Sequence, residues 1–219
     1  MLGQSISKNS FILGAFAMVT AGVLAFTFLG TKEKIAVEER KAAQKALLDI
    51  VPLSRHNNDI LNEVWDIPSE HLAQLGLPEA SSVHIAKQDG QAVAAIIPAI
   101  TPEGYSGDIK LIVGINLDGT IAGARVLVHR ETPGLGDKID LNKSDWILSF
   151  DGKSLTNPES DLWKVKKEGG EFDQLTGATI TPRAVVNRIK TTLEYFEANK
   201  AQIFANAQQS TSPDLTTAE

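Results

Sequence analysis

The chain has no cysteine among its 219 residues. That absence excludes disulfide bonds, cysteine-bound iron–sulfur clusters, covalently attached c-type haem, cysteine zinc sites and thiol catalysis. Four histidines are present (His56, His71, His84 and His129), and none pair at a spacing such as H-x-x-x-H that is typical of metal ligands. Any redox chemistry of this protein must therefore come from an organic cofactor.

The chain also lacks a basic stripe. Its formal net charge is −6, and no cluster of Lys and Arg is long enough to follow a phosphate backbone. We therefore expect no nucleic-acid partner. Hydrophobic residues make up 42% of the chain and charged residues 22%, which is ordinary for a folded domain with its own core.

One long stretch, residues 10–30, carries no charge. A helix needs about 20 apolar residues to cross the hydrocarbon layer of a membrane, so this stretch predicts a single transmembrane helix. The alternative is a cleaved signal peptide, whose apolar part is only about 7–15 residues and ends in small residues. Here the run is longer and ends with Phe26, Phe28 and Leu29, which favours a retained anchor.

The charges beside this stretch bear on its orientation. Lys8 precedes it, whereas Lys32, Lys34, Arg40 and Lys41 follow it. By the positive-inside rule this count places the large C-terminal part in the cytoplasm, although long domains can be exported regardless of flanking charge.

The rest of the chain predicts an α+β fold. Val83–Lys87 and Ala92–Ile97 flank an Asp-Gly pair, which is a hairpin signal, and Lys110–Asn116 with Thr120–Val128 predict the central hairpin of an antiparallel sheet. An apolar stripe predicts a last helix over Pro182–Phe204. We expect five segments: an N-terminal cytoplasmic stub 1–9, the transmembrane helix 10–30, a linker helix ended by Pro52 with an irregular segment (31–82), the domain 83–205 and a disordered tail 206–219.

The segment Asp173-Gln-Leu-Thr-Gly-Ala-Thr-Ile-Thr181 directly precedes Pro182. Pro is favoured at the first position of a helix and Thr at its cap, so we expect the Thr181 hydroxyl at the positive end of the last helix. Free backbone N–H groups at such a helix start stabilise a bound phosphate. A Thr-Pro pair is also common as a simple cap, and spacing alone does not separate the two interpretations.

A second segment, His129-Arg-Glu-Thr-Pro-Gly-Leu-Gly-Asp137, follows the longest predicted strand. Its Pro-Gly pair predicts a type II turn. Polar Glu131 and Thr132 beside apolar Pro133 and Leu135 could line a flat ring. The alternative is an ordinary loop in which Glu131 hydrogen-bonds the backbone; no ligand role is expected for His129.

Together these two segments resemble the FMN-binding domain of the G subunit of Rnf-type (Rsx-type) ion-translocating electron transport complexes. A related family is the C subunit of the sodium-translocating NADH:quinone reductase. The family marks are S/T-G-A-T-x-T and, upstream of it, E-T-P-G-L-G, and both occur here unbroken. The apolar N-terminal run, Tyr105-Ser106-Gly107 and the strand pair over 110–128 also resemble the Rnf-type G subunit, which makes that family the better match.

The resemblance implies a covalent cofactor: FMN attached through its phosphate to Thr181, the last threonine of the motif. It further implies residues that hold the cofactor, namely Thr176, Gly177, Ala178, Thr179, Glu131, Thr132, Gly134 and Leu135. A separate flavin transferase that uses FAD and Mg²⁺ would recognise Asp173, Gly177, Ala178 and Thr179. Because that enzyme acts outside the cytoplasm, the resemblance places the domain on the periplasmic side of the bacterial inner membrane, against the charge count.

The function implied is that of a single-pass redox subunit, which passes electrons between neighbouring membrane subunits and is not an enzyme on its own. The related complexes couple ferredoxin and NADH to ion movement or keep a redox regulator reduced. Two other classes stay open. One is a non-redox, membrane-anchored binding or assembly module, and the other is a threonine- or serine-dependent hydrolase, although no histidine lies near Thr181 and no G-x-S-x-G segment occurs.

Overall fold

The computed structural model describes residues 2–209, with side chains described for 8–38 and 40–205. It divides into two compact units, Met1–Ala42 and Ala43–Glu219. The α+β class predicted from the sequence is confirmed, because the second unit is built on one antiparallel sheet with helices packed against it.

The N-terminal helix α1 runs without a break from Leu2 to Ile50. It ends where the sequence predicts, because Pro52 disfavours helical backbone at Val51. Large apolar side chains between Phe11 and Leu29 are exposed along it. Within the described residues, α1 is the one helix that is long and apolar enough to cross a membrane.

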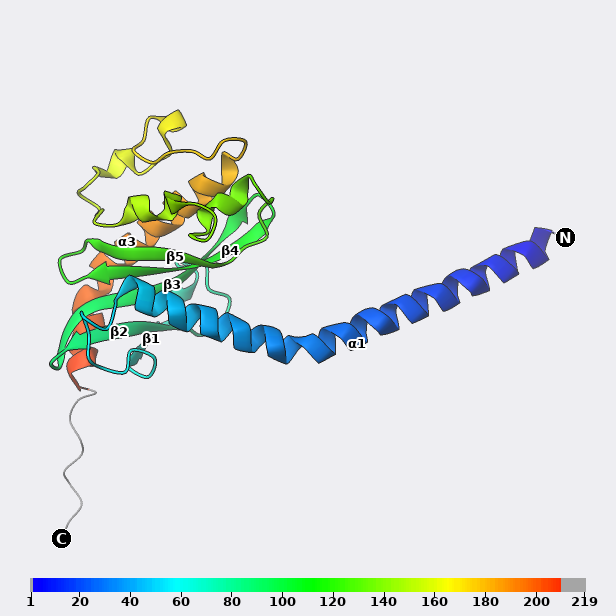
Figure 1. Ribbon diagram of the computed structural model, residues 1–219, viewed down its shortest axis with the longest axis horizontal. Coiled ribbons are helices and arrows are strands. Elements are labelled where there is room, and N and C mark those ends of the chain that lie inside the picture. Colours follow the sequence, from blue (N-terminus) through cyan, green and yellow to red (C-terminus); the bar gives the residue numbers. More distant parts are fainter. Residues whose placement is uncertain (1, 210–219) are drawn as a thin grey trace, which may run out of the picture. The chain divides into compact units, whose positions relative to one another are not determined.

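Five strands follow and form a meander in which every neighbouring pair is antiparallel, in the order β1-β2-β3-β4-β5 (Figure 1). The strands are β1 Val64–Asp66, β2 Ser82–Gln88, β3 Gln91–Gly104, β4 Gly107–Asn116 and β5 Ile121–Val128. A short helix, α2 Ser69–Leu72, lies between β1 and β2.

The predicted turn between β2 and β3 is confirmed. Asp89 and Gly90 both have positive φ, 52° and 80°, as a two-residue hairpin turn requires. The third strand is longer than predicted and continues through Pro98 to Gly104. The pairing of β2 with β3 ends at Ile96, so the proline lies where β3 pairs only with β4 and its missing N–H costs no ladder bond.

Two expectations about the sheet are wrong. The hairpin over residues 110–128 is not central, because β5 forms the edge of the sheet and β3 is the middle strand. The interval 52–82 is not wholly irregular, because β1 pairs with β2. Local sequence specifies a hairpin, whereas the order of strands depends on pairings between distant segments.

The sheet is covered on both faces. On one face Ile97, Leu111 and Val113 share a buried cluster with the last helix, and on the other Ile96 and Ile112 share one with the C-terminal turn of α1. Side chains of a strand alternate between faces, which produces these two separate cores from the same strands.

Four short 3₁₀ helices connect β5 to the last helix. They are η1 Gly136–Ile139, η2 Asp145–Phe150, η3 Ser160–Leu162 and η4 Lys166–Glu168. Three buried aromatic rings hold this connection together: Phe150 stacks on Phe172 with ring centroids 4.5 Å apart, and Trp163 lies 5.0 Å from Phe172. These rings belong to the same buried cluster as the sheet and α3, so the connection is packed onto the main core of the domain.

The last helix, α3, runs from Ile180 to Gln209. It starts two residues before the predicted Pro182, so Thr181 lies inside its first turn and is not its cap. At its other end, residues 206–209 of the predicted disordered tail belong to the helix, and residues 210–219 lie outside the described part of the chain.

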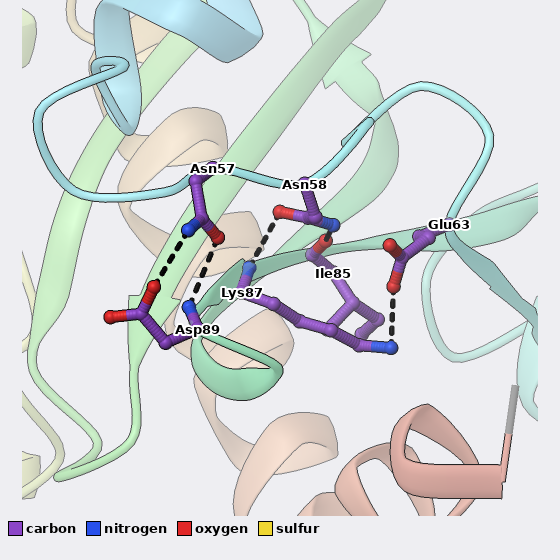
Figure 2. A network of polar contacts seen from close by, with 6 residues as sticks. All are labelled: Asn57, Asn58, Glu63, Ile85, Lys87 and Asp89. Atoms are coloured by element: carbon purple, nitrogen blue, oxygen red, sulfur yellow. Dashed lines mark hydrogen bonds and ion pairs between the residues drawn. The ribbon is translucent and has the colours of Figure 1, made fainter. Parts of the chain in front are cut away.

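The loop before β1 is tied to β2 by paired polar groups (Figure 2). The Asn58 side chain donates to the Ile85 carbonyl at 2.9 Å and accepts from the Lys87 N–H at 2.7 Å. Asn57 forms a similar two-bond pair with Asp89 at 2.9 and 3.0 Å. The buried Lys87 ammonium forms an ion pair with Glu63, so this loop is fixed to the sheet along its length.

Candidate functional site

A pocket of about 460 Å³ opens where the two motif segments meet. Ten residues line it, from three parts of the chain: Tyr105, Glu131, Thr132, Leu135, Gly136, Gly177, Ala178, Thr179, Ile180 and Thr181. The β3–β4 turn, the loop after β5 and the start of α3 supply them. Its size falls in the range of about 300–1,000 Å³ that is usual for small-molecule and cofactor sites.

The loop after β5 forms one wall through a tight turn. The Leu135 N–H donates to the Thr132 carbonyl at 3.1 Å, with Pro133 and Gly134 at the two central positions. Gly134 has φ 79°, the backbone conformation that a type II turn requires at its third position. The turn presents Thr132 and Leu135 to the pocket.

A second tight turn forms the opposite wall just before α3. The Ala178 N–H donates to the Leu175 carbonyl at 3.0 Å, and Gly177 has φ 82°. The two turns touch, because a Cβ placed on Gly177 would lie only 2.8 Å from the Leu135 Cδ2 atom. A side chain at position 177 would therefore displace Leu135.

At the base of the pocket the Thr181 hydroxyl donates a hydrogen bond to the Glu131 Oε2 atom. Both residues are almost fully buried, with exposed fractions of 0% for Thr181 and 4% for Glu131. The other carboxylate oxygen, Oε1, accepts from the Ser106 N–H at 2.9 Å. The Ser106 backbone therefore holds one carboxylate oxygen in place, while the Glu131 backbone N–H donates to the His129 Nδ1 atom at 3.2 Å.

Gly136 leaves the hydroxyl and carboxylate uncrowded. A Cβ at this position would lie 2.8 Å from the Thr181 Oγ1 atom and 2.9 Å from the Glu131 Oε2 atom. Such distances are too short for real atoms, so any larger residue would push the Thr181–Glu131 pair apart. The second glycine of the upstream motif is therefore needed for space.

Seven of the residues predicted for a cofactor or its transferase line this pocket, and Thr176 and Gly134, which lie at the centres of the two turns, do not. Asp173 also lies apart from it. Its carboxylate is exposed and forms an ion pair with Lys166 at 2.7 Å, which raises the pKa of the lysine. Its carbonyl accepts from the Trp146 indole N–H at 2.7 Å, which fixes the chain before the second turn.

Comparison with known proteins places this chain in a family. Residues 104–194 match the model of an FMN-binding domain, and residues 1–50 match that of the RnfG N-terminal region. The G subunit of the ion-translocating oxidoreductase complex of Pseudoalteromonas atlantica is 45% identical over 94% of this chain and 95% of its own length. The corresponding G subunit of Vibrio vulnificus is 47% identical over 91% of this chain and 93% of its own length. That of Pseudomonas aeruginosa is 44% identical over 92% of this chain and 94% of its own length.

The chain belongs to this family of G subunits. Among solved structures, it is similar to the C subunit of the Na⁺-translocating NADH-quinone reductase of Parabacteroides distasonis, at 23% identity over 62% of this chain and 65% of that one. The TM-score is 0.41, a likeness too slight to bear on function.

The region that matches the FMN-binding domain contains all ten lining residues of the G-subunit pocket. The lining suits a flavin. Tyr105, Leu135 and Ile180 are large apolar side chains that remain 69%, 41% and 45% exposed, so a flat ring system would cover surface that is otherwise in water. The first turn of α3 offers N–H groups with no partner inside the helix, which suits a phosphate.

Three lining residues were not among the predicted cofactor contacts: Tyr105, Gly136 and Ile180. Tyr105 belongs to the turn between β3 and β4, whose position depends on the unexpected length of β3. Gly136 and Ile180 lie within the two motifs, and their neighbours were predicted. Gly136 and Ile180 could have been found because they adjoin predicted contacts in the sequence. Tyr105 was part of the family resemblance, but no pattern in the sequence linked it to the cofactor.

Proposed function

We propose that this chain is the flavin-carrying G subunit of an ion-translocating oxidoreductase complex, and that FMN is bound covalently through a phosphoester to Thr181. The observation that carries the proposal is the pocket itself, in which the Thr181 hydroxyl lies between two turns at the start of a helix. The family of the chain and the names of its relatives support the same assignment.

In this assignment each part of the pocket has a task. Thr181 supplies the attachment oxygen, the first turn of α3 receives the phosphate, and Tyr105, Leu135 and Ile180 cover the ring. Bound FMN supplies reversible one- and two-electron transfer, while the protein orients the cofactor and tunes its potential. A covalent attachment keeps the cofactor on a subunit that faces a dilute compartment.

The partners follow from the same proposal. The helix α1 anchors the chain in the bacterial inner membrane as a single span, and the domain lies on the periplasmic side beside the other subunits of the complex. A flavin transferase loads the cofactor there. Asp173, which is exposed next to the second turn, and the turn residues Gly177, Ala178 and Thr179 form the surface that this enzyme would recognise.

Replacement of the attachment residue tests the proposal. The full chain, produced with a flavin transferase, should be yellow, fluoresce on a denaturing gel and gain the mass of one FMN minus water. Thr181→Val removes the hydroxyl at nearly constant volume, so labelling should be abolished. Thr179→Val is the comparison variant: Thr179 also lines the pocket and belongs to the surface that the transferase would recognise, so labelling should fall but some should remain.

Three results would contradict the proposal. A colourless protein from the wild-type chain would favour a binding or assembly module without redox activity. Flavin that washes away under denaturing conditions would exclude the covalent bond. Label that persists in Thr181→Val and disappears in Thr179→Val would move the attachment to the inner threonine.

A further inference from the structure

A buried carboxylate beside the attachment hydroxyl is unexpected at a site for an anionic phosphate. Glu131 accepts the Thr181 hydroxyl hydrogen through Oε2, while the Ser106 N–H holds Oε1 at 2.9 Å. One carboxylate oxygen is thus fixed by the backbone and the other receives the proton of the hydroxyl. A nucleophile within hydrogen-bonding reach of an oriented base is the arrangement by which proteins activate hydroxyl groups.

We propose that Glu131 acts as the general base for flavin attachment to its own chain. The proposal rests on the proposed function, because it needs Thr181 to be the attachment site. In the reaction, Glu131 takes the hydroxyl proton as the Thr181 oxygen attacks the FMN phosphorus of FAD, supplied with the transferase and Mg²⁺. A new phosphorus–oxygen bond forms, the pyrophosphate bond of FAD breaks, AMP leaves, and nothing is oxidised or reduced.

The neighbours of Thr181 favour Glu131 over other bases. Of the ten residues that line the pocket, only Glu131 and Tyr105 can titrate, and within the described part of the chain Tyr105 forms no hydrogen bond to the hydroxyl. The His129 ring lies beside Glu131, but its Nδ1 atom accepts the Glu131 N–H. Asp137 is buried and follows Gly136, with its Oδ1 atom unpaired among the described residues, and no hydrogen bond there joins it to Thr181.

The proton transfer also reduces the repulsion between Glu131 and the phosphate while the bond forms. None of the ten lining residues is Lys or Arg, so no side chain in the pocket wall would neutralise the anion. An ionised Glu131 would repel the phosphodiester in this poorly solvated place. In the attachment step the proton passes from the hydroxyl to Glu131, and the carboxyl group can then donate a hydrogen bond to a phosphate oxygen.

The test measures the initial rate of labelling of the purified full chain in detergent, with transferase, FAD and Mg²⁺. In-gel flavin fluorescence and intact mass report the label. Glu131→Gln keeps the size of the side chain and its bond to Ser106 but removes the base, so the rate should fall by about 10²–10⁴-fold. Glu79→Gln makes the same change at an exposed carboxylate that does not line the pocket; it is the control and should stay within a few-fold of wild type.

The dependence on pH separates a base from a structural role. Acid protonates the wild-type carboxylate and so abolishes its advantage, whereas Glu131→Gln has none to lose. The ratio of the variant rate to the wild-type rate should therefore rise toward acid pH. The pH dependence of the transferase itself does not affect this ratio, because the same enzyme acts in both reactions. In Glu131→Ala, added formate should restore the rate in proportion to its concentration, since it can occupy the vacated space and accept the proton.

The outcomes are distinct. A slow Glu131→Gln variant together with rescue of Glu131→Ala by formate supports the base. Labelling of Glu131→Gln at the wild-type rate overturns it, and so does a slow rate that neither formate nor pH alters, which would mean a role in folding or in transferase binding only. If the wild-type chain is not labelled on Thr181, the proposed function itself fails.

Discussion

At the scale of single residues, Leu135 is the side chain best placed to sense the flavin ring without touching its attachment. It lines the pocket, contacts the Gly177 turn and is 41% exposed. We predict that Leu135→Ala shifts the absorption spectrum or midpoint potential of the bound flavin, because water would reach one face of the ring. The amount of covalent label should not change, since the Thr181 hydroxyl is untouched.

Leu117→Ala is the matched control for this experiment. Leu117 is 44% exposed, follows the end of β4 and does not line the pocket. Its replacement removes the same atoms from a similar environment and should leave spectrum and potential unchanged. Equal spectra for wild type, Leu135→Ala and Leu117→Ala would remove the upstream loop from the flavin environment.

At the scale of secondary-structure elements, the end of α1 is fitted into the sheet by two glycines. Gly114 of β4 pairs with Gly123 of β5, and Ile50 packs over both. A Cβ on Gly114 would lie 2.2 Å from the Ile50 Cγ2 atom, whereas one on Gly123 would lie at an ordinary 3.4 Å from Ile50 Cγ1. We predict that Gly114→Ala lowers the free energy of unfolding by about 1–3 kcal/mol through overpacking. Gly123→Ala should lower the free energy of unfolding by less.

A double-mutant cycle can assign that cost to the helix contact. Ile50→Ala alone should destabilise by about 2–5 kcal/mol because it removes a buried side chain. In the Ile50→Ala background, Gly114→Ala should lower the free energy of unfolding much less, because the Ile50 Cγ2 atom that the new Cβ would contact is absent. Urea unfolding of the detergent-solubilised chain gives the four free energies. Additive effects would mean that Gly114 is needed for the strand and not for the helix above it.

The same elements show which features of the fold and the pocket could be predicted from the sequence alone. The Asp-Gly and Pro-Gly turns were predictable because positive φ at Gly90 and Gly134 is a property of the local backbone. The edge position of β5 and the extension of β3 past Pro98 were not, because they depend on which strands pair at a distance. The pocket was predictable only through its two motifs, and the Thr181–Glu131 contact spans 50 residues that no local pattern connects.

At the scale of the whole molecule, the lack of cysteine makes the orientation of the chain directly measurable. A single cysteine introduced into this background is the only thiol that a maleimide can modify. Glu79, in the loop before β2, and Asn9, in the N-terminal part of α1, are both exposed. If the domain is periplasmic, Glu79→Cys should react with a membrane-impermeant maleimide in intact spheroplasts, and Asn9→Cys only after lysis.

This measurement decides between two opposed arguments about the chain. Four basic residues follow the apolar stretch and one precedes it, which by the positive-inside rule favours a cytoplasmic domain. The proposed loading of Thr181 by an extracytoplasmic transferase requires the reverse. The unmodified chain should not react at all, which sets the background. Reaction of Asn9→Cys but not Glu79→Cys in spheroplasts would place Thr181 in the cytoplasm, so the flavin would then have to be loaded by an internal enzyme.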